Sequence, residues 1–136
     1  MKHLELAVQF GNPFLFENIS DFIDPMIDAY KWCDIIICRG GALTITEIMN
    51  LGIPSIIIPY PYAVDDHQMK NSRYLEENDA AIVINQKFFT DVHLANTLES
   101  FINNSELEEK LSKNISKLNK SDATKNICEA IIKGIN

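Results

Sequence analysis

The sequence is poor in the features that mark several large classes of protein. Its three cysteines, Cys33, Cys38 and Cys128, form no C-x-x-C pair, so we expect reduced thiols in a cytoplasmic protein rather than a disulfide framework or a zinc site. Positive charge is scarce, because 12 lysines and arginines face 19 aspartates and glutamates and leave a formal net charge of -7. This balance argues against a nucleic-acid partner. No apolar run is long enough to span a bilayer, and the N-terminal stretch makes a poor signal peptide.

What remains is the composition of a globular domain. The chain has 136 residues, of which 46% are hydrophobic and 23% charged, as expected for one soluble domain or part of one. Three short apolar runs, DIIIC, SIIIPY and AAIVIN, are typical of buried parallel strands. Between them, helical spacing predicts helices over residues 42–51, ended by Gly52, and over residues 67–78. The alternation predicts an α/β fold, a parallel sheet with flanking helices that binds ligands beyond the carboxyl ends of its strands.

Capping patterns predict further helix starts. Each pairs a Ser, Thr or Asp N-cap with an apolar stripe that follows at helical spacing. The predicted N-caps are Asp24 followed by Pro25, Thr90 or Asp91, Ser105 in a capping box with Glu108, and Ser121 or Asp122.

The beginning of the chain does not fit the start of a doubly wound sheet. Residues 1–20 contain no strand followed by a Gly-rich loop, since Gly11 stands alone before Asn12-Pro13. We therefore expect residues 21–136 to form a partial Rossmann-like domain whose first strand and Gly-rich loop are missing.

The segment CRGGALTITE, residues 38–47, has two interpretations. Two glycines between a strand and a helix let the backbone approach a ligand closely, and the N–H groups at the helix start favour an anion. The same glycines are also common in a turn that binds nothing. Glu47 either accepts hydrogen bonds from a ribose diol or closes a capping box on Thr44. A helix that begins near Gly41 or Ala42 would exclude the capping role.

Other polar and aromatic groups are equally open. His67 and Gln68 stand at a predicted helix start, where they either read sugar hydroxyls or merely follow a cap formed by Asp65 or Asp66, with His67 exposed. A metal site is disfavoured because no second histidine lies at ligand spacing. Tyr30 and Trp32 either stack on a base or pack in the core, and packing is the commoner outcome. No G-x-S-x-G motif or activated cysteine suggests a nucleophile.

Two signatures together indicate a family. A-L-T-x-x-E, at residues 42–47, and D-x-H-Q-x-x-N, at residues 65–71, occur in the order and at the separation of the MurG family within glycosyltransferase family 28. Residues 21–136 resemble its C-terminal part, whereas residues 1–20 are an unmatched segment. The family transfers GlcNAc from UDP-GlcNAc to undecaprenyl-pyrophosphoryl-MurNAc-pentapeptide, lipid I, and makes lipid II for peptidoglycan. The resemblance implies the C-terminal half of a GT-B fold, which holds the nucleotide sugar.

The resemblance also implies which positions bind UDP-GlcNAc. The uracil is implied to meet the main chain of Ile23, with Phe22 and Met26 lining its pocket. The diphosphate and sugar are implied to meet Ala42, Leu43 and Thr44, and the ribose to meet Glu47. Gln68, beside His67, is implied to bond the GlcNAc hydroxyls, and Arg39 to support the charge of the site. The complete implied set is Phe22, Ile23, Met26, Arg39, Gly41, Ala42, Leu43, Thr44, Ile45, Thr46, Glu47, His67, Gln68 and Asn71. No metal, cofactor or catalytic residue is implied.

The departures from the family shape the expected function. The family's N-terminal half, with its acceptor site, membrane-facing patch and His-bearing Gly-rich loop, has no counterpart here. We therefore expect a fragment that is inactive alone, that is cytoplasmic, and that touches the inner face of the cell membrane only through the missing half. Two alternatives remain: a non-catalytic nucleotide-sugar-binding subunit that docks on a separate acceptor-binding chain, and a non-functional gene remnant.

Overall fold

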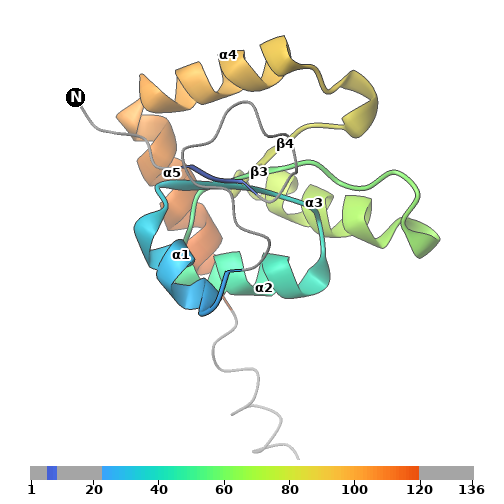
Figure 1. Ribbon diagram of the computed structural model, residues 1–136, viewed down its shortest axis with the longest axis horizontal. Coiled ribbons are helices and arrows are strands. Elements are labelled where there is room, and N and C mark those ends of the chain that lie inside the picture. The colour runs from blue at the N-terminus through green and yellow to red at the C-terminus, as the bar shows by residue number, and fades with distance from the viewer. Residues whose placement is uncertain (1–5, 9–22, 120–136) are drawn as a thin grey trace, which may run out of the picture.

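The computed structural model describes residues 6–8 and 23–119 of the protein. Four strands form one parallel sheet in the order β1-β2-β3-β4, namely β1 (Leu6–Val8), β2 (Ile35–Cys38), β3 (Ser55–Ile57) and β4 (Ile82–Val83). Five α-helices accompany them: α1 (Met26–Trp32), α2 (Ala42–Leu51), α3 (His67–Glu77), α4 (Asp91–Ile102) and α5 (Ser105–Lys117). The predicted parallel α/β sheet with flanking helices is thus confirmed (Figure 1).

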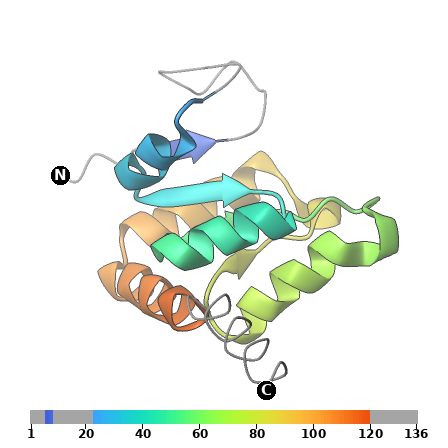
Figure 2. The same ribbon diagram turned by 90° about the horizontal axis from the view of Figure 1, so that it is seen from below.

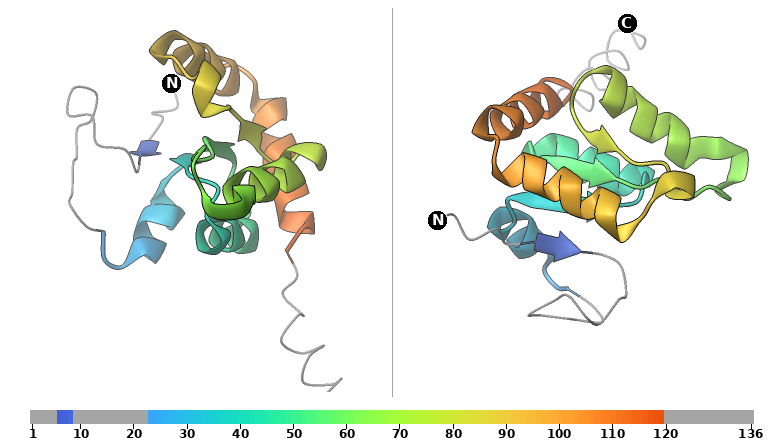
Figure 3. Two further views of the ribbon diagram at one scale, coloured as in Figure 1. Left: turned by 90° about the vertical axis from the view of Figure 1, so that its right-hand side faces the viewer. Right: turned by 90° about the horizontal axis from the view of Figure 1, so that it is seen from above.

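Isoleucines on alternate sides of the central strands make two apolar layers, because successive strand residues point to opposite faces. Ile36 and Ile57 belong to the layer that meets α2 and α3, whereas Ile37 and Ile56 belong to the layer that meets α4. In Figure 2, seen from below, α1, α2 and α3 lie on the viewer's side of the sheet, and the right-hand view of Figure 3 shows α4 lying across the opposite face. Because both faces are covered, the strands are apolar on both sides rather than alternating.

Helix α5 belongs to both layers. Leu111 packs in the cluster under α4, and Ile115, one turn later, packs in the cluster with α2 and α3. Its contact with α2 is close, because the Ser112 hydroxyl donates to the Gly52 carbonyl at 2.9 Å. Gly52 ends α2 as predicted, in the left-handed conformation with φ of 70°.

The segment before residue 21 differs from expectation. Leu6–Val8 forms a strand that pairs in parallel with β2, with Leu6 opposite Ile35 and Val8 opposite Ile37. Such a short strand, flanked by glutamate and glutamine, carries little local signal, and it depends on a neighbour almost thirty residues away. Residues 9–22, which follow this strand in the sequence, are outside the described residues.

The capping predictions fare unequally. Thr90 caps α4 as predicted, since its hydroxyl accepts the N–H of His93 at 3.1 Å. Two others are wrong by one residue: α1 begins after Pro25 rather than at it, and α5 is capped by Asn104 rather than Ser105. Asn104 accepts the Leu107 N–H at 3.1 Å, which leaves no capping box with Glu108. The helix predicted from Ser121 or Asp122 lies outside the described residues.

Candidate functional site

Three loops follow the carboxyl ends of β2, β3 and β4, where parallel sheets bind ligands. The first runs from Arg39 to Gly41, the second from Tyr60 to Asp66, and the third begins after Ile84. The loop residues and the first turns of α2 and α3 contain most of the positions that the sequence suggested. The structure shows which of these positions lie open and which serve the fold.

The first loop ends in an uncapped helix start. Helix α2 begins at Ala42 with Gly41 as its N-cap, and no side-chain cap bonds to the N–H groups of its first turn. The first intrahelical bond is that of the Ile45 N–H to the Gly41 carbonyl, at 2.9 Å. Ala42 and Leu43 are exposed and Thr44 is half-buried. The N–H groups of this first turn have no carbonyl within the helix to bond and can therefore receive an anion.

Glu47 is not part of a capping box. With the helix starting at Ala42, Thr44 is already the third helical residue and cannot be the N-cap. Glu47 lies one turn beyond Thr44 on the same exposed face. Its Oε2 atom instead accepts a hydrogen bond of 2.6 Å from the hydroxyl of Tyr30, on α1. The structure thus removes the capping interpretation of Glu47.

The contact of Tyr30 with Glu47 is not predicted by the sequence. Its aromatic ring is buried in the core, as the packing interpretation predicted, but its hydroxyl reaches the edge of the candidate site. Buried tyrosines usually form a hydrogen bond with their O–H group, and this general rule is the only indication in the sequence that Tyr30 has a polar partner. Nothing in the local sequence points from Tyr30 to a partner 17 residues away.

Gly40 joins the first loop to α3. A Cβ atom at Gly40 would collide with the Gln68 carbonyl and lie 2.5 Å from Ser72 Oγ. The Asn71 side chain completes this contact by donating to the Gly40 carbonyl at 3.0 Å. Asn71, one of the implied ligand residues, therefore has a defined partner within the fold. At Gly41, by contrast, the nearest atom to an added Cβ is Thr44 Oγ1, at 3.9 Å.

The second loop positions Gln68 and leaves His67 exposed. The Gln68 side-chain oxygen accepts the Tyr60 N–H at 2.9 Å, so its amide NH₂ group is the part that can donate to a ligand. Asp66 precedes α3 in the left-handed conformation, φ 57°, and makes no side-chain cap. Exposed His67 lies 3.8 Å from the Asp65 carboxylate. Asp66 thus occupies the suggested N-cap position without making a capping bond, and the exposure of His67 is as expected.

Arg39 connects all three loops. Its guanidinium donates to the Ile58 carbonyl at 3.1 Å and to the side-chain oxygen of Gln86, in the third loop. It also lies over the Tyr60 ring, 5.6 Å from the centroid. Gln86 was not singled out by sequence, because a lone glutamine after a strand has no distinctive pattern. The sequence places Arg39 among the candidate site residues, and the structure shows that its side chain holds the three loops together.

The remaining predicted residues divide by exposure. Ile23 and Thr46 are exposed, and Met26 is half-buried against the core. Ile45 is buried and its N–H bonds within α2, so the geometry does not support direct ligand contact there. Phe22 lies outside the described residues.

Within the described ranges, no three His, Cys, Asp or Glu side chains gather as around a metal ion. Burial raises the pKa of the Cys38 thiol to about 12, which keeps it protonated.

Comparison with known proteins identifies the family. The glycosyltransferase family 28 C-terminal domain matches residues 5–127, a match that begins inside the segment left unmatched above. A UDP-N-acetylglucosamine--N-acetylmuramyl-(pentapeptide) pyrophosphoryl-undecaprenol N-acetylglucosamine transferase of Shewanella denitrificans is 41% identical over 82% of the chain and 31% of its own length. Transferases of the same name from Psychromonas ingrahamii and Coxiella burnetii are 42% and 40% identical, each over 81% of this chain and 31% of its own length. The chain thus spans about a third of the length of these relatives.

Solved structures agree with the sequence relatives. The crystal structure of MurG from Acinetobacter baumannii superposes with a TM-score of 0.71 and 35% identity, over 82% of this chain and 32% of that one. A glycotransferase of kitacinnamycin superposes with a TM-score of 0.64 at 21% identity and shows the shared fold. Among residues 6–8 and 23–119, no helix has both the length and the apolarity that crossing a membrane requires. On these matches, the chain belongs to glycosyltransferase family 28, whose C-terminal domain it represents.

Proposed function

We propose that this chain binds UDP-GlcNAc as the donor-binding part of a transferase that adds GlcNAc to lipid I and makes lipid II for peptidoglycan. The observation that carries the proposal is the geometry of α2. Its first turn begins at Ala42 without a side-chain cap. Glu47, which takes no part in a capping box, lies about one turn further along the helix and accepts a hydrogen bond from Tyr30. An anion-binding helix start next to a carboxylate that can accept a diol matches a nucleoside diphosphate.

The ligand would lie along the carboxyl edge of the sheet. The N–H groups of Ala42, Leu43 and Thr44 would receive the diphosphate, and Glu47 the ribose hydroxyls. The amide NH₂ of Gln68 would donate to the sugar, since its oxygen already accepts the Tyr60 N–H. Exposed Ile23, just before α1, is proposed to meet the uracil with its main chain.

The remaining positions support these contacts. Half-buried Met26 would line the uracil pocket. Gly41 and Thr46 would act through the shape of the α2 start, where the Thr46 hydroxyl donates to the Ala42 carbonyl at 2.9 Å. Arg39 and Asn71 would hold the loops in place through the bonds already described.

The proposed reaction needs a second set of residues for the acceptor. In the complete enzyme, a base would remove the proton of the MurNAc 4-hydroxyl, whose oxygen then forms a bond to the anomeric carbon as the bond to UDP breaks. The helix N–H groups would stabilise the negative charge that develops on the departing diphosphate. We propose that a separate acceptor-binding half supplies the base and the membrane contact, and that this chain works on the cytoplasmic side and is inactive alone.

Calorimetry of the purified 136-residue chain tests the donor site. We expect UDP-GlcNAc and UDP to bind, and UMP to bind more weakly because it lacks the second phosphate. Glu47→Ala should weaken UDP-GlcNAc binding by about tenfold or more, as expected for losing hydrogen bonds to a charged group.

Glu76→Ala, which removes an exposed carboxylate near the far end of α3, is the matched control and should change nothing. Absence of heat with millimolar UDP-GlcNAc, in a chain shown to be folded, would exclude the proposed site. Equal losses in the two variants would point to a charge effect rather than to ribose recognition.

A further inference from the structure

The hydrogen bond between Tyr30 and Glu47 joins the buried core to the exposed edge of the candidate site. The Tyr30 hydroxyl lies 2.6 Å from Glu47 Oε2, and it links α1 to α2 across 17 residues of sequence. We propose that Tyr30 is a positioning residue, which holds the Glu47 carboxylate in the orientation that accepts the ribose hydroxyls of the nucleotide. This inference rests on the proposed function and adds a residue to it.

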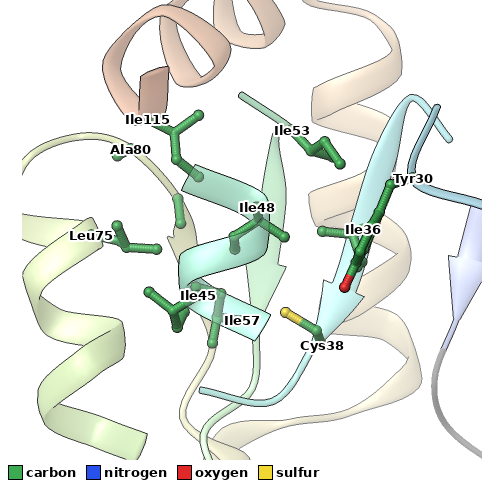
Figure 4. Close-up of a cluster of buried hydrophobic side chains, with 11 residues drawn as sticks. Tyr30, Ile36, Cys38, Ile45, Ile48, Ile53, Ile57, Leu75, Ala80 and Ile115 are labelled. Atoms are coloured by element: carbon green, nitrogen blue, oxygen red, sulfur yellow. The ribbon is translucent and has the colours of Figure 1, made fainter. Parts of the chain in front are cut away.

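Tyr30 is fixed where it stands. Its side chain is only 8% exposed, and it packs in a cluster that contains Ile36 and Cys38 of β2 and Ile45 and Ile48 of α2. Figure 4 shows the ring of Tyr30 beside Ile36, with the other members of the cluster around α2. A ring held in a close-packed core has little rotational freedom, so its hydroxyl is a rigid donor.

Glu47, in contrast, would be mobile without this partner. It is an exposed residue in the middle of α2, and a glutamate side chain on a helix surface samples several rotamers. One carboxylate oxygen bonded to Tyr30 restricts those rotamers while the second oxygen and the remaining lone pairs stay available. Ligand binding then has less side-chain entropy to remove, which is the general advantage of a preorganised site.

Tyr30 also stays a donor over the whole working range of pH. Burial, followed by the hydrogen bond to Glu47, raises the pKa of the Tyr30 hydroxyl well above its ordinary value. The hydroxyl therefore stays protonated, and able to donate, at physiological pH.

A comparison of ribose and deoxyribose ligands separates positioning from simple structural support. The full chain is titrated with UDP and with 2′-deoxy-UDP, which differ only in one ribose hydroxyl. We expect the unaltered chain to prefer UDP by about tenfold, and Glu47→Ala to abolish that preference. Tyr30→Phe, which removes only the hydroxyl, should lower the preference by at least about threefold while 2′-deoxy-UDP binds nearly as before.

Two further variants complete the design. Glu47→Asp keeps the charge but is too short to reach Tyr30, so it should lose the ribose preference even with the tyrosine intact. Tyr74→Phe makes the same chemical change at an exposed tyrosine of α3 and should leave the preference unchanged. Circular dichroism of each variant establishes that it is folded under the titration conditions.

The outcomes are distinct. If Tyr30→Phe weakens both ligands by the same factor, the tyrosine only stabilises the fold and the inference is wrong, although the donor site stands. If the unaltered chain binds UDP without preferring it to 2′-deoxy-UDP, Glu47 does not read the ribose and the inference also fails. If the unaltered chain binds neither nucleotide, the proposed function fails and the inference with it.

Discussion

At the scale of single residues, the two adjacent glycines after β2 have different tasks. Gly40 lies against the first turns of α3, where the Gln68 carbonyl and the Ser72 hydroxyl occupy the space that a side chain would need. Gly41, the N-cap of α2, has room for a methyl group 3.9 Å from Thr44 Oγ1 and an ordinary φ of -68°. The close approach that the glycine pair suggested is therefore an approach to α3 at Gly40, and the helix start at Gly41 is left open.

This difference predicts unequal losses of stability for two neighbouring substitutions. Gly40→Ala should lower the free energy of unfolding by about 1–3 kcal/mol, because backbone atoms of α3 must move to admit the methyl group. Gly41→Ala should cost less than about 1 kcal/mol, the loss expected when alanine replaces glycine at an N-cap. Urea unfolding of both variants measures the difference. Equal costs would mean that the β2–α2 turn does not pack on α3 as described.

At the scale of elements, the capping of a helix start determines whether its first N–H groups are available to a ligand. Helix α2 has no side-chain cap and exposes its first N–H groups, whereas α4 and α5 are capped by Thr90 and Asn104. Capping satisfies these donors within the chain, and its absence leaves them for a ligand. The uncapped start of α2 thus stands beside Arg39 and the start of α3, which carries Gln68, whereas the capped helices are α4, on the opposite face, and α5, which belongs to both layers.

The start of α5 gives a prediction at the same scale. Asn104→Ala should lower the free energy of unfolding by about 1 kcal/mol, because the Leu107 N–H loses the Asn104 oxygen that accepts it. Ser105→Ala should be nearly neutral, since Ser105 is already the first helical residue. Chemical denaturation of the two variants is the measurement. A larger loss for Ser105→Ala would restore the capping box that the sequence suggested.

At the scale of the whole molecule, α5 couples the two layers on either side of the sheet. Its Leu111 side chain belongs to the cluster with α4 and its Ile115 side chain to the cluster with α2 and α3. Two further contacts, Ser112 with Gly52 and Lys110 with Asp79, connect the helix to the ends of α2 and α3. We therefore expect the described layers to unfold together.

Ile115→Ala tests this coupling. The side chain is fully buried, so its truncation should cost about 2–5 kcal/mol, whereas Ile102→Ala, at a 52% exposed position, should cost less than about 1 kcal/mol. Trp32, the single tryptophan, reports on α1 by fluorescence while far-ultraviolet circular dichroism reports on all helices. Both signals should shift to the same lower urea midpoint. A Trp32 transition that stays in place while the dichroism shifts would show that α5 does not stabilise the α1 layer.

Several elements were predictable from sequence because their causes are local or periodic. The runs of isoleucine predicted the strands at residues 35–38 and 55–57, and Gly52 predicted the end of α2, because no other residue adopts a positive φ so easily. Errors occurred where neighbouring residues are equally suitable, as in Asn103-Asn104-Ser105, or where a strand is short and flanked by polar residues, as in Leu6–Val8. In both cases the choice depends on packing against distant segments.

The sequence by itself determined the fold class, the order of the elements after residue 23 and the family, since hydrophobic periodicity and two spaced signatures can be read directly from the chain. It also placed Arg39, Gln68 and Glu47 at the ends of strands or in the first turns of helices. Only the tertiary structure decided what these side chains bond to. The partner of Glu47 is Tyr30, the partners of Arg39 are Ile58 and Gln86, and that of Gln68 is Tyr60. Such contacts join residues on different elements and loops, and their geometry follows from how the helices pack on the sheet.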